Sequence, residues 1–405
     1  MTLALVGSAF ALAAWLCVLV APYQPHRVRE RLEADADGSD DDLGTVTAIV
    51  PARNEAELIG RTIAALAQQG RGLAVVVVDD QSSDDTRGAA ERALGALKGD
   101  ALKGDGLIFA ENKSVPFSVP FLTLRVVDGR PLPDGWAGKL WALEQGLAVA
   151  DRPHVLLLDA DIELAPRTIP ALLAKLRERD ATLVSLMAEL KCETFWERLL
   201  SPAFVFFFKL LYPFARSNDA AKATAAAAGG CMLVRTDVLR QIGGFAAIRG
   251  ALIDDCTLAA ALKRQRPPIW LGLTHSVRSL RAYPTLGDFW SMVARSAFTQ
   301  LRYSSWLLLL ATALMIVTLL VPVAGIVVGA ALADWRLALT AGAAWLAIAA
   351  AYWPVVSFYR LPSAWAAALP LAGALFLAMT WSSAIGYWRG TRARWKARDY
   401  GRSAG

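Results

Sequence analysis

The sequence predicts an α/β domain with a mainly parallel sheet, joined to several transmembrane helices. Two observations support this prediction. Short apolar runs that end in acidic residues alternate with helix-forming segments between residues 45 and 302, which is the pattern of a parallel sheet. Outside this region the chain has uncharged stretches that are each long enough to cross a bilayer, which takes about 20 helical residues.

The membrane part is indicated by composition. Hydrophobic residues make up 55% of the 405 residues, and the mean hydropathy of +0.39 is high for a soluble protein. Four stretches carry no charged residue: Met1–Pro25, Tyr303–Ala333, Leu337–Tyr359 and Leu361–Trp388. We therefore expect five parts: a transmembrane anchor at 1–25, a basic and acidic linker at 26–44, a globular domain at 45–302, about three transmembrane helices at 303–388 and a basic tail at 389–405.

The charges beside the first span predict its orientation. The arginine-rich segment His26–Arg31 follows it directly, and positive residues after a span stay in the cytoplasm. The stretch before it has no Lys or Arg, so we prefer an uncleaved anchor to a signal peptide. The expected location is the inner (cytoplasmic) membrane, with the globular domain facing the cytoplasm. Three further spans would leave the basic tail outside, so either a C-terminal segment is re-entrant or Leu199–Phe214 also inserts.

The charge and the cysteine content argue against nucleic-acid binding and against a zinc site or disulfide framework. The net charge of +6 comes largely from arginines beside the spans, which suits anionic lipid headgroups. The globular part has no basic stripe, so nucleic acid is not an expected partner. The four cysteines are widely spaced and there are only three histidines. A zinc site or a disulfide framework is therefore not expected.

Three segments of the globular region read as strands. Thr45–Glu55 is an apolar strand with a polar loop, and Leu73–Thr86 repeats this plan. His154–Leu164 contains a third strand that runs into the sequence "DAD". In extended chain Asp159 and Asp161 point to the same side, where their charges repel unless a cation is present.

The polar residues of these three segments fall at strand ends. They are Arg53–Glu55, Asp79–Asp85 and Asp159–Asp161. An isolated D-x-D sequence is more often a solvated turn. Because ligands bind at the carboxyl ends of parallel strands, three such clusters favour a binding site over a turn.

The ordered set "VPARNE", "VVVDDQSSDDT", "DAD" and "IDDCTLA" resembles family 2 glycosyltransferases, which have the Rossmann-like GT-A fold. The resemblance covers roughly residues 45–303. With its spans, the chain resembles hopene-associated glycosyltransferases more closely and ceramide glucosyltransferases more distantly. The resemblance implies a hexosyltransferase that moves a sugar with inversion from a nucleotide donor, linked to UDP, to a lipid hydroxyl. The lipid that it suggests is a hopanoid.

The resemblance also implies a divalent cation, Mg²⁺ or Mn²⁺, at the "DAD" sequence. Asp161 would contact the metal, and Asp159 would lie toward the ribose and sugar as well as the metal. A hard cation with oxygen ligands neutralises the charge of a departing diphosphate. The repulsion between the two aspartates is tolerable for the same reason.

The nucleotide would be bound by the first two strand ends. Pro51, Arg53 and Glu55 match the first nucleotide-binding loop of the family, with Glu55 near the ribose or base. One of Asp79 and Asp80 would accept the uracil N–H, although the residues after them could also cap the next helix.

The chemistry itself would depend on residues after the donor half. Lys139 lies in a segment, Gly135–Gly146, where the family has a glycine–lysine motif, and it would approach the diphosphate as a point charge. Asp255 would be the base that removes the proton of the acceptor hydroxyl, with Asp254 as its neighbour. Adjacent carboxylates raise one another's pKa, which suits a base near neutral pH.

The weakest match is "TQLRY" at Thr299–Tyr303. Membrane relatives have Q/R-x-x-R-W here, with the arginine on the diphosphate. Arg302 matches that arginine, but it could equally be a snorkelling residue beside the next span.

Two other functions stay open. The first is a processive polysaccharide synthase, which the altered "TQLRY" sequence makes less attractive. The second is a transporter or flippase whose soluble domain only senses nucleotide sugars. Transporters usually place ionisable residues within their spans, and the four uncharged stretches contain no Asp, Glu, Lys, Arg or His.

Overall fold

The computed structural model describes residues 2–35, 41–103, 122–264, 267–390, 394–395 and 398–399. The chain divides into two compact units. The helical unit comprises Met1–Arg29, Leu190–Arg216 and Ala282–Arg394. The sheet unit comprises Glu30–Glu189, Ser217–Arg281 and Trp395–Gly405. The sheet unit therefore begins inside the expected linker at 26–44. Residues 190–216, which were expected in the globular domain, belong to the helical unit.

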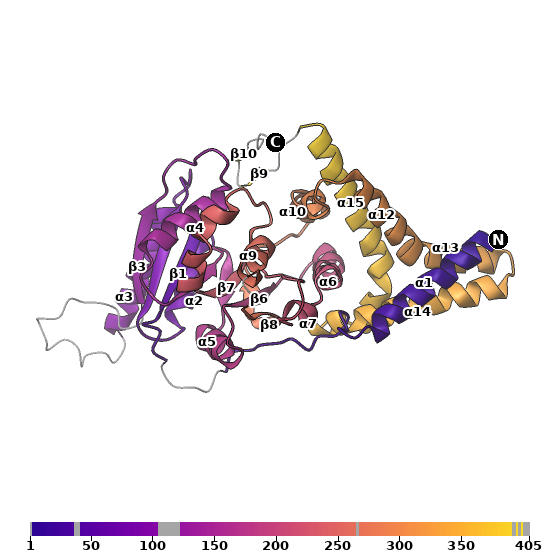
Figure 1. Ribbon diagram of the computed structural model, residues 1–405, viewed down its shortest axis with the longest axis horizontal. Coiled ribbons are helices and arrows are strands. Elements are labelled where there is room, and N and C mark those ends of the chain that lie inside the picture. Colours follow the sequence, from indigo (N-terminus) through magenta and orange to yellow (C-terminus); the bar gives the residue numbers. More distant parts are fainter. Residues whose placement is uncertain are drawn as a thin grey trace, which may run out of the picture. The chain divides into compact units, whose positions relative to one another are not determined.

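The sheet unit contains an eight-stranded sheet with the order β3-β2-β1-β4-β7-β6-β8-β5 (Figure 1). The strands are β1 (Val46–Ala52), β2 (Leu73–Asp79), β3 (Leu122–Asp128), β4 (His154–Leu158), β5 (Ile162–Leu164), β6 (Leu183–Glu189), β7 (Cys231–Arg235) and β8 (Ile269–Ser279). The β3-β2-β1-β4 half is parallel, as is the β6–β8 pair. β7 is antiparallel to both neighbours, and β5 is antiparallel to β8. The predicted α/β fold with a mostly parallel sheet is confirmed.

Helices cover both faces of this sheet because successive strand residues point to opposite sides. Ala48 and Val50 of β1 pack in one cluster with side chains of α2, α3 and α5. Ile49 packs in the other with side chains of α4, α8 and α9. Each buried Val, Leu or Ile side chain stabilises the fold by roughly 1.5–3 kcal/mol. The helical elements of this unit are α2 (Ile59–Ala67), α3 (Thr86–Lys103), α4 (Gly138–Val149), α5 (Thr168–Glu178), α8 (Thr236–Gln241), the 3-10 helix η2 (Gly244–Ile248) and α9 (Asp254–Lys263).

The helical unit contains the apolar stretches of the sequence. Its elements are α1 (Thr2–Val20), α6 (Phe195–Leu211), α10 (Leu286–Ala294), α11 (Ala297–Gln300), α12 (Ser305–Met315), the π-helix η3 (Ile316–Leu320), α13 (Val321–Ala331), α14 (Trp335–Phe358), the 3-10 helix η4 (Ser363–Ala368) and α15 (Leu369–Trp388). The chain passes from the helical unit to the sheet unit within the short α7 (Phe214–Ser217). Two further short strands, β9 (Arg394–Trp395) and β10 (Arg398–Asp399), pair with each other.

Four helical segments of the described chain are long and apolar enough to cross a membrane: Leu3–Val20, Ser305–Ala331, Trp335–Phe358 and Ser363–Trp388. They fall on the four uncharged stretches of the sequence. α6 has 17 residues and begins with a capping box between Thr194 and Glu197. It is not among the four segments, and the insertion of Leu199–Phe214 stays a prediction.

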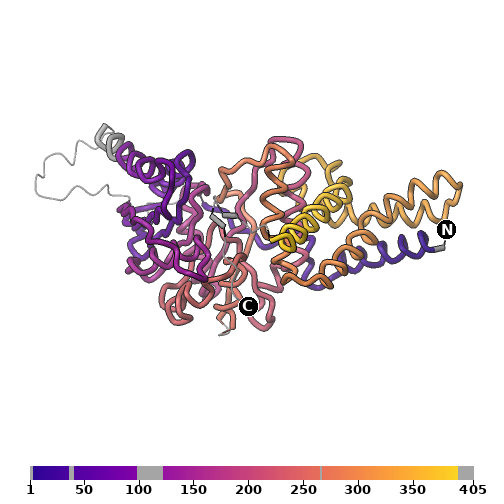
Figure 2. Tube along the Cα trace, turned by 90° about the horizontal axis from the view of Figure 1, so that it is seen from above, coloured from indigo at the N-terminus to yellow at the C-terminus, as the bar shows by residue number. Residues whose placement is uncertain are grey.

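The first span packs against the later ones within the helical unit. α1 lies along α13 and α14, which are far from it in the sequence (Figure 2). Trp15 donates its indole N–H to the carbonyl of Thr318 in η3 at 2.9 Å. The wider turn of a π-helix leaves carbonyls without their usual partner. A side chain at Gly329 would place its Cβ 2.7 Å from the Ala338 nitrogen, so glycine allows α13 and α14 to approach closely.

Part of the expected linker lies along β8. Leu273 donates its N–H to the Glu30 carbonyl at 2.8 Å, and Leu32 donates to the Leu273 carbonyl at 3.1 Å. The Glu33 carboxylate accepts from the Thr274 hydroxyl at 3.0 Å and from the His275 N–H at 2.8 Å. Residues 30–34 therefore occupy an edge of β8 that would otherwise have unpaired backbone groups.

Candidate active site

The predicted site residues gather where β1, β2 and β4 end. Asp159 follows β4, and its N–H donates to the Gly230 carbonyl at 3.1 Å. Its own carbonyl accepts from the Ile162 N–H at 3.1 Å, which makes a tight turn into β5. This turn places Asp159 and Asp161 at the carboxyl edge of the sheet, as predicted for a strand that runs into two carboxylates.

Lys139 joins two of the acidic segments. Its ammonium group lies 2.7 Å from Asp159 Oδ1 and 3.2 Å from Asp254 Oδ2, and only 18% of its side chain is exposed. Burial alone would lower the pKa of Lys139, but the negative charges of Asp159, Asp254 and Asp255 raise it above its usual value. Lys139 is therefore a charged, largely buried member of the site. Its predicted contact with a diphosphate stays a prediction.

Asp159 lies close to other carboxylates of the cluster. Burial and the nearby charge of Asp161 raise the pKa of Asp159 to about 6, although Lys139 acts in the opposite direction. The pKa of Lys139 rises because three carboxylates surround it, whereas the pKa of Asp159 rises mainly through burial, to which the charges of Asp161 and Asp254 add. Negative charge therefore exceeds positive charge around Lys139, and a further cation would stabilise the cluster.

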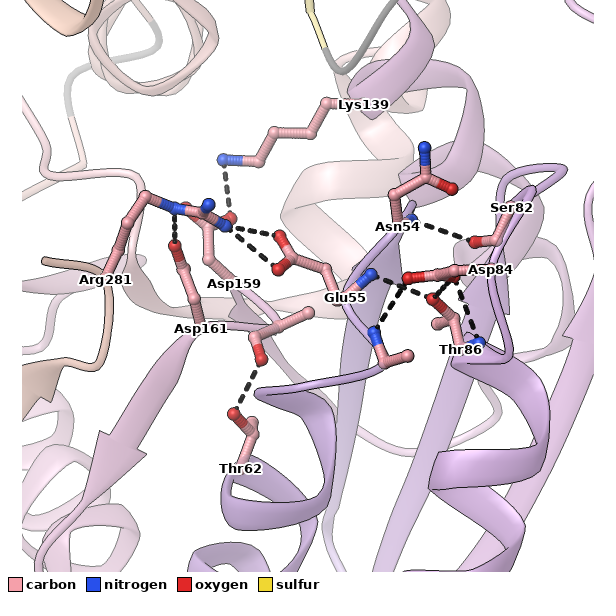
Figure 3. A network of polar contacts seen from close by, with 12 residues as sticks. Asn54, Glu55, Thr62, Ser82, Asp84, Thr86, Lys139, Asp159, Asp161 and Arg281 are labelled. Atoms are coloured by element: carbon pink, nitrogen blue, oxygen red, sulfur yellow. Dashed lines mark hydrogen bonds and ion pairs between the residues drawn. The ribbon is translucent and has the colours of Figure 1, made fainter. Parts of the chain in front are cut away.

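Arg281 pairs with the second residue of the "DAD" sequence (Figure 3). Its Nε lies 2.7 Å from Asp161 Oδ2, and its Nη2 lies 2.7 and 2.9 Å from the two oxygens of Glu55. Glu55 is only 8% exposed. Sequence reasoning missed Arg281, because a single arginine after a strand carries no motif.

The first loop is held to the second by hydrogen bonds (Figure 3). Arg53 donates to the carbonyls of Asp80 and, at 3.0 Å, of Gln81. The Glu55 N–H donates to the Thr86 hydroxyl at 2.8 Å. Asn54, which has a positive φ of 52°, donates its N–H to the Ser82 hydroxyl at 3.0 Å. Arg53 therefore ties the two loops together, a role that the sequence did not predict.

The other predicted nucleotide residues occupy the ends of β1 and β2. Pro51 lies within β1, opposite Val78 of β2. Asp79 Oδ1 accepts from both the backbone N–H and the hydroxyl of Ser82. The side chain of Asp80 is fully buried. The role of Asp79 or Asp80 as acceptor of the base N–H stays a prediction.

Asp254 and Asp255 begin helix α9. Asp255 Oδ2 accepts from the Gly229 N–H at 2.9 Å, and Oδ1 accepts from the Cys256 N–H at 2.7 Å. Burial and the charge of Asp254 raise the pKa of Asp255 to about 6, against the opposing effect of these two N–H groups and Lys139. A Cβ at Gly229 would lie 3.3 Å from both Asp255 Oδ2 and Lys139 Nζ, so glycine keeps this approach open.

Arg302 is the one predicted site residue in the helical unit. Arg302 and Tyr303 both have positive φ values, 52° and 56°. The ring of Tyr303 stacks on Tyr387 with centroids 4.5 Å apart, and its hydroxyl accepts from Thr299 at 3.0 Å. These contacts hold a strained turn between α11 and α12. The catalytic role of Arg302 stays a prediction.

The carboxylates fit a divalent cation that binds together with a phosphate ligand. Among the described residues, no group of three or more His, Cys, Asp or Glu side chains could hold a metal alone. Asp159 and Asp161 offer carboxylate oxygens, which suit Mg²⁺ or Mn²⁺. Mg²⁺ in particular is often held by one or two carboxylates plus substrate phosphates.

The fold and the acidic edge define a GT-A-like protein, and a solved structure has the same fold. It is the mannosyltransferase PcManGT from Pyrobaculum calidifontis, in complex with GDP-Man and Mn²⁺. The two chains share 20% identity with a TM-score of 0.51, over 96% of this chain and 100% of that one. The model of glycosyl transferase family 21 matches residues 120–401, and the chain belongs to this family. It is a glycosyltransferase.

Part of the chain also matches family 2. The model of glycosyl transferase family 2 matches residues 47–102. Glucosyl-3-phosphoglycerate synthase from Mycobacterium tuberculosis, in complex with Mn²⁺ and UDP-Glc, is 18% identical with a TM-score of 0.40, over 67% of this chain and 87% of that one. No curated protein matches the chain. The closer resemblance to hopene-associated or ceramide enzymes stays a prediction.

Proposed function

We propose that this chain is a membrane-bound, inverting hexosyltransferase that moves a sugar from a UDP-linked donor to a lipid hydroxyl. The observation that supports this most is the position of Lys139. It touches Asp159 of the donor half and Asp254 of the acceptor half, at 2.7 and 3.2 Å. The proposed donor-binding carboxylate Asp159 and Asp254, the neighbour of the candidate base Asp255, are thereby held within one connected cluster.

The donor would lie at the ends of β1, β2 and β4. Asp79 or Asp80 accepts the base N–H, and Glu55 lies beside the ribose. A nucleotide sugar and Mn²⁺ are present in the mannosyltransferase complex of the same fold, which supports this class of donor. A divalent cation at Asp161 and Asp159 would neutralise the diphosphate as it departs.

The remaining steps belong to the side chains of the protein. The two N–H groups on Asp255 fix both of its oxygens. Asp255 takes the proton of the acceptor hydroxyl as that oxygen bonds to the anomeric carbon. The bond from this carbon to the diphosphate breaks on the opposite face, so the configuration inverts. Lys139 holds Asp159 and Asp254 in place and favours the charged form of the departing phosphate.

A lipid acceptor is proposed because the glycosyltransferase unit is joined to four helical segments long and apolar enough to cross a membrane. The hopanoid class rests on the sequence resemblance. We place the catalytic unit on the cytoplasmic side of the inner membrane, since basic residues follow the first span. A topology reporter fused after Asp42 should be active only in the cytoplasm, and activity only outside would contradict this orientation.

The test is a transfer assay with the full chain in detergent, a membrane lipid extract, Mn²⁺ and radiolabelled UDP- and GDP-sugars in turn. We expect one UDP-sugar to label an organic-soluble lipid with a single sugar, and EDTA to stop the reaction. A ladder of products would instead indicate a polysaccharide synthase. Donor binding without transfer to any lipid would support a nucleotide-sugar sensor. The anomeric configuration of the product, measured by NMR, tests inversion.

A further inference from the structure

Arg281 connects two carboxylates that come from different parts of the sheet (Figure 3). Glu55 lies in the loop after β1, and Asp161 lies between β4 and β5. Arg281 follows β8 and contacts Asp161 through Nε at 2.7 Å and Glu55 through Nη2 at 2.7 and 2.9 Å. The side chains of Glu55 and Asp161 are only 8% and 17% exposed, so both charges are partly removed from water.

We propose that Arg281 is a positioning residue that makes divalent-cation binding at Asp161 depend on the donor diphosphate. This inference rests on the proposed function, because it assumes that Asp161 binds the cation. Arg281 engages Oδ2 of Asp161, while Oδ1 has no hydrogen bond to the described residues. This contact orients the carboxylate and leaves Oδ1 for a cation, and 17% of the Asp161 side chain is exposed. The guanidinium charge on the same carboxylate opposes that cation.

The diphosphate changes this balance. Its negative charges compensate the repulsion between Arg281 and the cation, so each ligand favours the other. Coupling between two ligands is reciprocal and typically amounts to about 5–150-fold in affinity. We therefore infer that the free protein binds Mn²⁺ weakly, and that a nucleoside diphosphate and Mn²⁺ bind cooperatively.

The contact with Glu55 gives Arg281 a second effect. Its guanidinium engages Asp161 and both oxygens of Glu55 at the same time, and a lysine lacks the planar fork for this. Loss of the fork removes these two contacts of Glu55 in the nucleotide loop. The coupling between Mn²⁺ and the nucleotide then depends on the charge of the side chain at position 281, whereas nucleotide affinity depends on the shape of that side chain.

The backbone around Arg281 does not depend on its side chain. Leu280 donates its N–H to the Asp161 carbonyl at 2.8 Å, and β5 pairs with β8 up to Ile162 and Ser279. Variants at position 281 should therefore fold. A matched control is Arg61, which donates to both oxygens of Glu163 at 3.0 and 3.1 Å on the surface, outside the site.

The experiment measures Mn²⁺ binding to the full chain in detergent, by electron paramagnetic resonance of free Mn²⁺, with and without UDP. Arg281→Gln should tighten Mn²⁺ binding to the free protein by about tenfold and reduce its coupling to UDP by a similar factor. Arg281→Lys should keep the wild-type Mn²⁺ affinity and coupling but weaken UDP binding. Arg61→Gln should match the wild type in all three quantities.

Two results would overturn the inference. One is unchanged Mn²⁺ affinity and coupling in Arg281→Gln, and the other is an Arg281→Lys variant whose Mn²⁺ binding resembles that of Arg281→Gln. If Arg281→Gln does not fold, Arg281→Lys decides alone: wild-type Mn²⁺ affinity and coupling with weaker UDP binding support the inference, and tighter Mn²⁺ binding with reduced coupling overturns it. These outcomes leave the proposed function standing when the wild type binds UDP and Mn²⁺ cooperatively. A wild type that binds neither would overturn the proposed function and this inference together.

Discussion

The candidate site contains two pairs of carboxylates, Asp159 with Asp161 and Asp254 with Asp255, and their charges are compensated in different ways. Asp159 and Asp161 contact the side-chain cations Lys139 and Arg281 at 2.7 Å each. Asp255 accepts instead from two backbone N–H groups, at 2.9 and 2.7 Å, and its neighbour Asp254 has the longer contact of 3.2 Å with Lys139.

The difference suggests two kinds of work. Side-chain cations can move when another cation or an anion enters, so the first pair suits a ligand of variable charge. Backbone N–H groups are fixed and neutral, so they orient Asp255 without removing its basicity. Burial and the charge of Asp254 raise the pKa of Asp255 to about 6, close to the range in which a general base works well.

The largest effect is expected from the first pair. Asp161→Ala removes a proposed metal ligand and should abolish measurable transfer, because neutralising the departing diphosphate is worth several kcal/mol in the transition state. Initial rates at saturating donor and Mn²⁺ measure this. Glu163→Ala is the control, since Glu163 is two residues away and pairs only with exposed Arg61 among the described residues. Full activity of Asp161→Ala would show that the two pairs do not divide the work as proposed.

The second pair should separate binding from turnover. Asp255→Asn keeps the size of the side chain but loses its basicity, so kcat should fall by about 10²–10⁴-fold. UDP affinity, measured by calorimetry, should stay near the wild-type value. The control is Asp237→Asn, because Asp237 forms an exposed surface ion pair with Arg235. An unchanged kcat in Asp255→Asn would mean that the base has been assigned to the wrong residue.

The sequence predicted the strands of the proposed donor half, and the polar residues at their ends, because these signals are local. Each of β1, β2 and β4 is a continuous apolar run that ends in polar residues, so both the strands and their functional ends could be identified. The parallel order of these strands then brought their ends together. The first pair of carboxylates needed no more than this.

The contacts between distant segments could not be predicted in the same way. Arg281 lies 120 positions from Asp161 and 226 from Glu55, and single arginines have no recognisable spacing. The antiparallel strand β7 between β4 and β6 also depends on non-local pairings, such as His154 with Arg235 and Leu183 with Val234. The hydrogen bonds between Glu33 and β8 were missed because residues 26–44 were expected to be a charged linker. All three result from tertiary pairing, on which local periodicity carries no information.

A smaller effect on kcat is expected from Asp254→Asn, because Asp254 is proposed to act on Asp255 through its charge. Asp254→Asn should reduce kcat by no more than about tenfold, since it removes no proton-transfer group. It also removes the like charge that raises the pKa of Asp255. The acid limb of the kcat–pH profile should therefore move to lower pH. A loss of activity as large as that of Asp255→Asn would show that the two aspartates act as one unit.

The smallest shift of the kcat–pH profile, and the sharpest test of the comparison, is the opposite shift expected from Lys139→Met, whose loss of rate is a separate effect. The wild-type kcat should fall as the pH drops through about 6, because Asp255 must be ionised to accept a proton and burial with Asp254 raises its pKa to that value. Lys139 holds this pKa down, so Lys139→Met should move the acid limb to higher pH, the reverse of Asp254→Asn. Saturating donor keeps any loss of donor affinity out of kcat. Shifts in the same direction, or none, would mean that Asp255 is not the group that titrates, and that the charges around Lys139 act on donor binding alone.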